Sequence, residues 1–183
     1  MRIISGSARG RKLKDVTINI RPTGDMIKES IFNIIQFDIE GRKILDLFAG
    51  CGQLGIEALS RGAESAVFVD SNPGAIKLIS QNLRLCGFSD VSNLRNIDAI
   101  KYLEKNTQDG SFDIIFIDPP YDTSLLSEAM EAVIKFDKLN RNGIIICETS
   151  INSLVPTASE PYVFIKEYKY GSTKILRYDR LSD

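Results

Sequence analysis

The segment Asp118-Pro119-Pro120-Tyr121 places a carboxylate, two prolines and an aromatic ring directly after a nearly all-apolar run at 112–117. Proline cannot donate to a sheet ladder, so a buried strand that stops here ends in a rigid turn. The Asp118 carboxylate and the Pro119 carbonyl can accept both hydrogens of an exocyclic amine on a nucleobase, which points the nitrogen lone pair outward. Tyr121 can stack on that base once the base has left its own stack. The alternative is a proline-stiffened turn with a surface tyrosine.

Gly50, Gly52 and Gly55 have the spacing G-x-G-x-x-G and lie between an expected strand and an expected helix. Such a turn lets a ligand approach the backbone closely, and flavin, nicotinamide and S-adenosylmethionine enzymes all use similar turns. Asp46 favours a ligand with an ammonium group, as the methionine part of S-adenosylmethionine has, because a carboxylate repels a pyrophosphate. Asp70 ends the next strand, where an acidic residue can bind ribose hydroxyls. The alternative is that both carboxylates only cap strand ends.

Asp98 follows a third expected strand at 91–96 and precedes an expected helix at 99–105. In a sheet of this kind the position lies beside the adenine ring of a bound cofactor, where a carboxylate can accept from the exocyclic amine. A carboxylate directly before a helix is also a good N-cap. Both interpretations remain open from the sequence.

The order of elements indicates what positions these residues. Five apolar or β-rich runs alternate with amphipathic stretches, which predicts a doubly wound, Rossmann-like α/β sheet that is mostly parallel. The last two runs have no helix between them and predict an antiparallel hairpin at the C-terminal edge. A small β-hairpin, with strands at 2–4 and 12–18 joined around Gly6 and Gly10, precedes the first helix. The expected strands are 43–48, 65–70, 91–96, 112–118, 143–149, 162–170 and 173–179; the expected helices are 25–37, 54–61, 73–86, 99–105 and 124–136.

The composition restricts the class of protein. A chain of 183 residues that is 43% hydrophobic and 26% charged suits one globular domain, here an extension at 1–40 and a core at 41–183. The absence of histidine excludes imidazole catalysis and His-ligated zinc, and three scattered cysteines favour a reducing cytoplasm and disfavour any metal site. No apolar run approaches the ~20 residues of a membrane span, and the N-terminus lacks a signal-peptide core.

The charges are unevenly distributed. Residues 1–21 hold six of the 23 basic residues and one of the 24 acidic residues, which leaves 17 basic and 23 acidic residues in the rest. A basic arm on an acidic body predicts contact with nucleic-acid phosphates. We expect this arm to be too polar to belong to the core; the alternative is a solvated hairpin with ordinary surface charge. The predicted nucleic-acid-binding residues are Arg9, Arg11, Lys12, Lys14 and Arg21.

Together these segments resemble S-adenosylmethionine-dependent methyltransferases that act on exocyclic amines, and in particular the RsmD-type bacterial enzymes. The similar segments are "MRIISGSARGRKL", "RPTGDMIKESIFNII", "DLFAGCGQLGIEALSRGA", "FDIIFIDPPY" and "YGST", in the same order over nearly the whole chain. Cys51 and Gln53 depart from the small residues that are common in that family, and Ser30 stands where Ala is usual. Neither departure gives a reason to expect different chemistry.

The resemblance implies a role for each matching residue. The methionine end of the cofactor would contact Asp46, Gly50 and Gly52, the ribose Asp70, and the adenine Asp98. The segment Arg21-Pro22-Thr23 would cover the mouth of the cofactor site. The complete expected cofactor-binding set is Asp46, Phe48, Gly50, Gly52, Asp70, Ser71, Asp98 and Ala99, and the catalytic set is Asp118, Pro119, Pro120 and Tyr121.

The resemblance also implies the reaction, which is methyl transfer from S-adenosylmethionine to N2 of a guanine in small-subunit (16S) ribosomal RNA. The partner would be ribosomal RNA or an assembly particle, bound by a cytoplasmic monomer without metal or membrane. Two alternatives remain: an adenine-N6 DNA methyltransferase, which uses the same turn, and a catalytically inactive nucleic-acid-binding module. The chain leaves little room for a DNA-reading domain, and the intact motifs argue against loss of activity.

Overall fold

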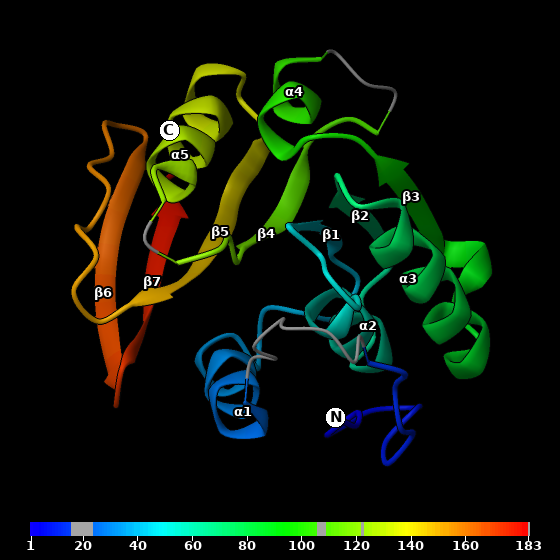
Figure 1. Cartoon of the computed structure of the whole chain (residues 1–183). Coiled ribbons are helices and arrows are strands. Elements are labelled where there is room, and N and C mark those ends of the chain that lie inside the picture. The colour runs from blue at the N-terminus through cyan, green and yellow to red at the C-terminus, as the bar shows by residue number, and fades with distance from the viewer. Residues whose placement is uncertain (16–23, 106–108, 122, 183) are drawn as a thin grey trace.

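The computed structural model describes residues 1–15, 24–105, 109–121 and 123–182. Its centre is a seven-stranded sheet with the order β3-β2-β1-β4-β5-β7-β6 (Figure 1). Strands β1 to β5 are parallel, and β7 lies antiparallel between β5 and β6. The expected sheet, mostly parallel with an antiparallel C-terminal edge, is therefore confirmed. The strands are β1 Lys43–Leu47, β2 Ser65–Asp70, β3 Ser92–Asn96, β4 Phe112–Ile117, β5 Leu139–Ser150, β6 Tyr162–Tyr170 and β7 Thr173–Arg180.

Helices cover both faces of the sheet (Figure 1). Successive strand residues point to opposite faces, so in β1 Ile44 packs with α1, α2 and α3, while Leu45 and Leu47 pack with α4 and α5. The predicted doubly wound arrangement is thus confirmed. None of the helices in the described part of the chain has the length and apolar character needed to cross a bilayer. The helices are α1 Asp25–Ile34, α2 Gln53–Ser60, α3 Pro73–Cys86, α4 Ala99–Glu104 and α5 Leu125–Lys135, with a short 3₁₀ turn η1 at Ser89–Val91.

The ends of the elements lie within one residue of the predicted bounds, with two larger differences. Helix α3 has the predicted bounds, because the Asn72 side chain accepts from the Gly74 N–H at 2.8 Å and Gly87 ends the helix at φ 80°. Helix α1 ends at Ile34 instead of 37. Strand β5 begins at Leu139 instead of 143, and Asn142 at φ 58° lies at an irregularity in its pairing with β4.

Residues 1–15, which we call the N-terminal segment, form the predicted hairpin pairing over a shorter length: the Ile3 N–H donates to the Arg11 carbonyl at 2.9 Å and the Leu13 N–H to the Met1 carbonyl at 3.3 Å. They contain one antiparallel bridge, between Arg2 and Lys12, and residues 16–18 lie outside the described residues. The N–H groups of Ile4 and Ser5 donate to the buried Glu57 carboxylate on α2 at 2.8 and 3.0 Å. The backbone of the segment therefore pairs with itself around one bridge, and the next two N–H groups pair with a helix side chain instead of extending the ladder.

The N-terminal segment is also part of the core. Ile3, Ala8 and Leu13 are buried in the same apolar cluster as α1 and α2. A Cβ atom on Gly6 would lie 1.7 Å from the Ser60 carbonyl oxygen, so only glycine permits this approach. The prediction that the segment is too polar for the core is wrong, because its apolar residues point inward while its cations point outward.

Candidate active site

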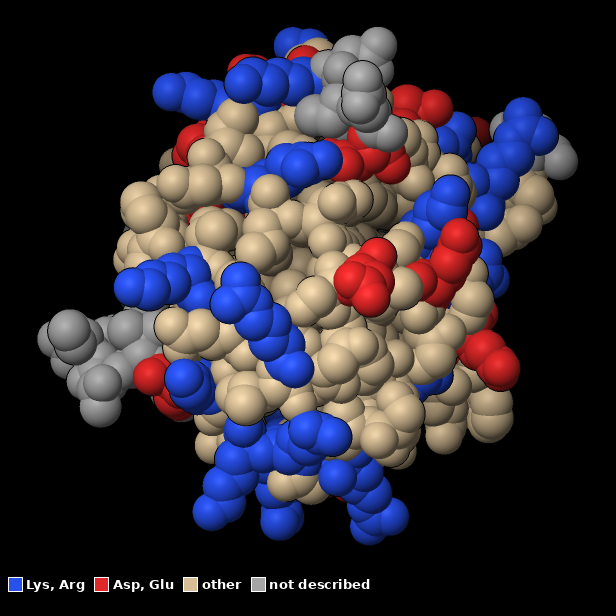
Figure 2. Space-filling model, turned by 90° about the vertical axis from the view of Figure 1, so that its right-hand side faces the viewer, with Lys and Arg blue, Asp and Glu red and all other residues tan. Residues whose placement is uncertain are grey.

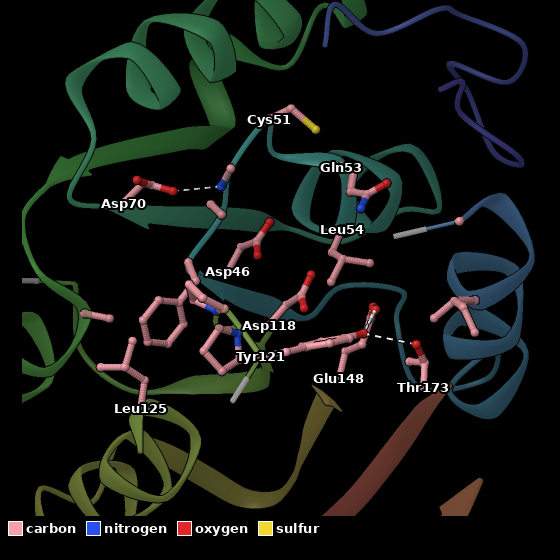
Figure 3. A pocket seen from close by; sticks show the side chains of 18 of the residues that line it. Asp46, Cys51, Gln53, Leu54, Asp70, Asp118, Tyr121, Leu125, Glu148 and Thr173 are labelled. Atoms are coloured by element: carbon pink, nitrogen blue, oxygen red, sulfur yellow. Dashed lines mark hydrogen bonds between the residues drawn. The ribbon is translucent and has the colours of Figure 1, made fainter. Parts of the chain in front are cut away.

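A pocket of about 850 Å³ opens where the parallel strands β1, β2 and β4 end (Figure 3). Ligands of open α/β sheets bind along this carboxyl edge. The turn between β6 and β7 closes the pocket from the other side through Gly171, Ser172 and Thr173. The predicted residues that line it are Asp46, Phe48, Gly50, Asp70, Ser71, Asp98, Ala99, Asp118, Pro119, Pro120 and Tyr121.

The glycine turn between β1 and α2 has a left-handed backbone. Phe48, Gly50 and Gly52 have φ values of 59°, 57° and 78°. Gly50 faces the pocket with no side chain in the way, whereas Gly52 does not line it: a Cβ there would meet Ile56 and Ile79 at 3.2 Å. The structure thus assigns Gly52 to the turn and its packing, and a ligand contact at this residue stays a prediction.

Asp46 is the most deeply buried carboxylate of the pocket. Its side chain is on a residue that is 2% exposed, and its Oδ2 atom accepts from the Gly55 N–H at 2.9 Å. Burial raises its pKa from 3.8 to about 7; the Gly55 N–H opposes this rise and the nearby negative charge of Asp70 adds to it. A cationic group in the pocket would stabilise the ionised form of this carboxylate.

Asp70 holds the glycine turn against β2. Its Oδ2 atom accepts from the Gly50 N–H and its Oδ1 atom from the Asn72 N–H, both at 2.8 Å. A carboxylate oxygen can accept a second hydrogen bond, so these contacts leave acceptor capacity for ligand hydroxyls. The residue therefore orders the loop as well as lining the pocket, which the sequence did not indicate.

The sequence left two roles open for Asp98, an N-cap of a helix and a ligand contact, and the structure bears on both. Its Oδ1 atom accepts from the Lys101 N–H at 3.0 Å, which caps α4. The same residue and Ala99 border the pocket. The N-cap is thus confirmed, and contact of Asp98 with an adenine ring stays a prediction.

Tyr121 is held by two buried residues that the sequence analysis missed. Its hydroxyl donates to Glu148 Oε1 at 2.8 Å and lies 3.1 Å from Thr173 Oγ1 (Figure 3). Burial and the neighbouring Glu148 charge raise the pKa of Tyr121 above its usual range, while the Thr173 hydrogen bond opposes the rise. The hydroxyl is anchored, so the ring has a fixed orientation beside Asp118 in the pocket.

Other unpredicted residues line the pocket, among them Met1, Gln53 and Leu125. Cys51 also lies there, and burial raises its pKa to about 11, which keeps the thiol protonated and a poor nucleophile. Its Sγ atom is 3.6 Å from Met1 Sδ. Among the residues that the structure describes, no group of three or more His, Cys, Asp or Glu side chains could hold a metal ion.

Four of the predicted nucleic-acid-binding residues are described, and none of the four lines the pocket. Arg9, Arg11, Lys12 and Lys14 are exposed on the N-terminal segment. Arg11 Nη1 donates to the Leu85 carbonyl at the end of α3. Arg21 and the segment Arg21-Pro22-Thr23 lie outside the described residues, so their predicted roles stay untested.

A family model described as "Conserved hypothetical protein 95" matches residues 1–179. The chain belongs to this family, the RsmD family. The resemblance found in the motifs is thereby confirmed. By family and fold the protein is a methyltransferase.

Individual relatives agree with this assignment over most of their lengths. "Putative rRNA methyltransferase YlbH" of Bacillus subtilis is 37% identical over 98% of this chain and 99% of its own. "Ribosomal RNA small subunit methyltransferase D" of Haemophilus influenzae is 34% identical over 93% of this chain and 89% of its own. The solved structure of "Putative methyltransferase yhhF from Escherichia coli" superposes with a TM-score of 0.88 at 28% identity, covering 100% of this chain and 99% of the other.

Proposed function

We propose that this RsmD-family protein transfers a methyl group from S-adenosylmethionine to the exocyclic N2 of a guanine in small-subunit ribosomal RNA. The observation that supports this most strongly is the presence of Asp118, Pro119 and Tyr121 in one pocket with the glycine turn. The name of the Haemophilus influenzae relative supports the class of RNA, and the choice of guanine N2 rests on the family resemblance. The substrate is cytoplasmic RNA, free or in an assembly particle.

The cofactor end of the pocket fits S-adenosylmethionine, which supplies an electrophilic methyl group on a sulfonium. Asp46 is a buried carboxylate with a raised pKa, and it gains a partner when an ammonium group binds. Gly50 leaves open space for the methionine part. Asp70 accepts from ribose hydroxyls and Asp98 from the adenine amine, each with the acceptor capacity left by its backbone contacts.

The base end of the pocket provides the acceptors and the platform. The Asp118 carboxylate and the Pro119 carbonyl each accept one hydrogen of the guanine amine, so its lone pair points toward the cofactor end. Tyr121 stacks on the base, and its anchors Glu148 and Thr173 keep the ring in place before the base arrives. A base stacked on an aromatic side chain gains about 1–3 kcal/mol, which is similar to the cost of extracting it.

Labelled S-adenosylmethionine tests the proposal. The wild-type protein is mixed separately with small-subunit ribosomal RNA, small-subunit assembly particles and DNA, and the labelled nucleic acid is digested to nucleosides. Label in N2-methylguanosine from RNA supports the proposal. Label in N6-methyladenine from DNA would establish the adenine-N6 alternative, and RNA binding without label would establish an inactive binding module.

A matched pair of variants ties the label to the site. Asp118→Ala removes the proposed amine acceptor. Asp90→Ala removes an exposed carboxylate of η1. Label that disappears with the first substitution and persists with the second comes from this pocket.

A further inference from the structure

The N-terminal segment and helix α3 form one continuous surface. The Lys14 N–H donates to Asn82 Oδ1 at 2.8 Å, and Asn82 Nδ2 donates to the Lys14 carbonyl at 3.0 Å. Lys14 Nζ donates to Gln81 Oε1 at 3.0 Å. Arg11 contacts the Leu85 carbonyl further along the same helix. The N-terminal segment therefore lies along α3, with Lys14 beside residues 81 and 82 and Arg11 nearer the C-terminal end of the helix.

Helix α3 adds two exposed cations to this surface. Lys77, Gln81 and Arg84 are spaced i, i+4 and i+7, so they lie on one face of the helix. Lys14 reaches that face through its contact with Gln81. We define Arg11, Lys14, Lys77 and Arg84 as the basic stripe.

The two segments that carry the basic stripe contain no acidic residue, and Asp15 follows directly after the first of them. Residues 1–14 and 73–86 together contain seven Lys or Arg and no Asp or Glu. None of the four stripe cations forms an ion pair within the described chain, whereas Arg61, Arg95, Arg177 and Arg180 are each paired with a carboxylate. Figure 2 shows Lys and Arg side chains gathered at the lower end of this face, where the N-terminal segment and the end of α3 lie. Because no carboxylate of the described chain neutralises them, these four cations can attract an anion from outside the protein.

The position of the stripe connects it to the pocket. Ser71 lines the pocket and is two residues before the start of α3, and Asp15, next to Lys14, lines it as well. From Lys77 to Arg84 the helix rises about 10 Å, a length over which one strand of a duplex carries about three phosphates. A polyanionic strand with one base in the pocket can follow α3 away from the pocket.

We propose that Lys77 and Arg84 of α3, together with Arg11 and Lys14, bind the RNA backbone beside the target base. The proposal rests on the proposed function for the identity of the polyanion. It extends that function by a second element, α3, which carries no motif and which the sequence did not single out. The stripe positions RNA and takes no part in the chemistry.

The test compares two double variants with the same change in charge. Lys77→Gln with Arg84→Gln neutralises α3 while keeping good helix formers. Lys135→Gln with Lys166→Gln removes two exposed cations from α5 and β6, at the other side of the sheet. Binding to small-subunit ribosomal RNA is measured across a salt series, with S-adenosylmethionine titration and the methylation rate at saturating RNA as controls.

Two lost phosphate contacts reduce the slope of log affinity against log salt by about 1.4–1.8, which is roughly 25- to 60-fold weaker binding at 0.1 M salt. Cofactor affinity and the rate at saturating RNA stay at wild-type values. If the α3 variant matches the α5/β6 variant while wild type methylates RNA, the stripe is refuted and the proposed function stands. If wild type neither binds nor methylates RNA, both fail.

Discussion

Replacing Asp46 by Asn tests whether this carboxylate is buried for a cationic ligand. The substitution keeps an acceptor for the Gly55 N–H, which now donates to Asp46 Oδ2 at 2.9 Å, and removes the charge. The folded-state pKa of about 7 exceeds the ordinary 3.8, so the stability contributed by this carboxyl is complete below pH 3.8 and is lost as pH rises through 7. A difference of about three pKa units corresponds to about 4 kcal/mol at 1.36 kcal/mol each.

Without cofactor, the Asp46→Asn variant should therefore be more stable than wild type at alkaline pH. We expect the difference in unfolding free energy to be about 4 kcal/mol at pH 8 and about 2 kcal/mol at pH 5, because the wild-type carboxyl is protonated in the fold at pH 5. Urea unfolding at both pH values measures it. Asp90→Asn, in the exposed turn η1, is the control and should show no such difference.

The same pKa makes cofactor binding depend on pH. A ligand that carries an ammonium group requires the ionised Asp46, so wild-type affinity for S-adenosylmethionine should fall about 25-fold from pH 7.5 to pH 5.5. This window stays below the α-amino pKa of about 7.7–8.0, at which the ligand loses its own charge. The Asn variant should bind about 1.5–3 kcal/mol more weakly at pH 7.5 and lack this pH dependence.

Two results would refute this account of Asp46. Equal unfolding free energies for wild type and variant at pH 8 would show that burying the ionised carboxylate does not destabilise the fold. A wild-type affinity that is flat from pH 5.5 to 7.5, measured by calorimetry, would show that the cofactor does not depend on its charge.

Three further predictions concern the turns around the pocket. Asp118→Ala should lower turnover by about 10²–10⁴-fold with unchanged cofactor affinity, measured by methylation rate and calorimetry; activity within threefold of wild type would contradict its role as amine acceptor. Asp70→Ala should weaken S-adenosylmethionine binding by about 1.5–3 kcal/mol in calorimetry, and unchanged affinity would leave Asp70 as a support for Gly50 only. Gly55→Ala should lower the unfolding free energy by about 1–3 kcal/mol in urea, because its Cβ would lie 2.3 Å from Phe68; equal stability would mean that the Phe68 ring can move aside.

The fold was predictable because its signals are local. The bounds of α3 follow from Pro73 at its start and Gly87 at its end, and the alternating elements imply a parallel sheet. The N-terminal hairpin is shorter than predicted because the N–H groups of Ile4 and Ser5 pair with Glu57, more than fifty residues away. No local pattern could show that a helix carboxylate takes the place of a strand partner.

The candidate site also contains residues that the sequence predicted and residues that it did not. Asp46, Asp70 and Asp118 were found because parallel strands end at one edge, so carboxylates at those ends meet. Thr173 was missed because it reaches this edge at the start of β7, which runs antiparallel to β5, whereas Glu148 lies near the carboxyl end of the parallel strand β5. The one available signal was a carboxylate at the end of an apolar run, since a buried Glu in such a strand needs a partner.

The buried polar groups at the two ends of the pocket differ in how fully the fold supplies their hydrogen-bond partners. At the proposed cofactor end, Asp46 has one backbone donor and a raised pKa, so a cationic ligand would supply the interaction that the fold leaves out. At the proposed base end, the Tyr121 hydroxyl already contacts both Glu148 and Thr173, so no ligand is needed to fix its ring. The Asp46 carboxylate can thus contribute binding energy at the end where the cofactor is proposed to bind. In the proposed function, the ring is rigid where a base meets acceptors at fixed positions, since preorganised groups stabilise a transition state without reorganising.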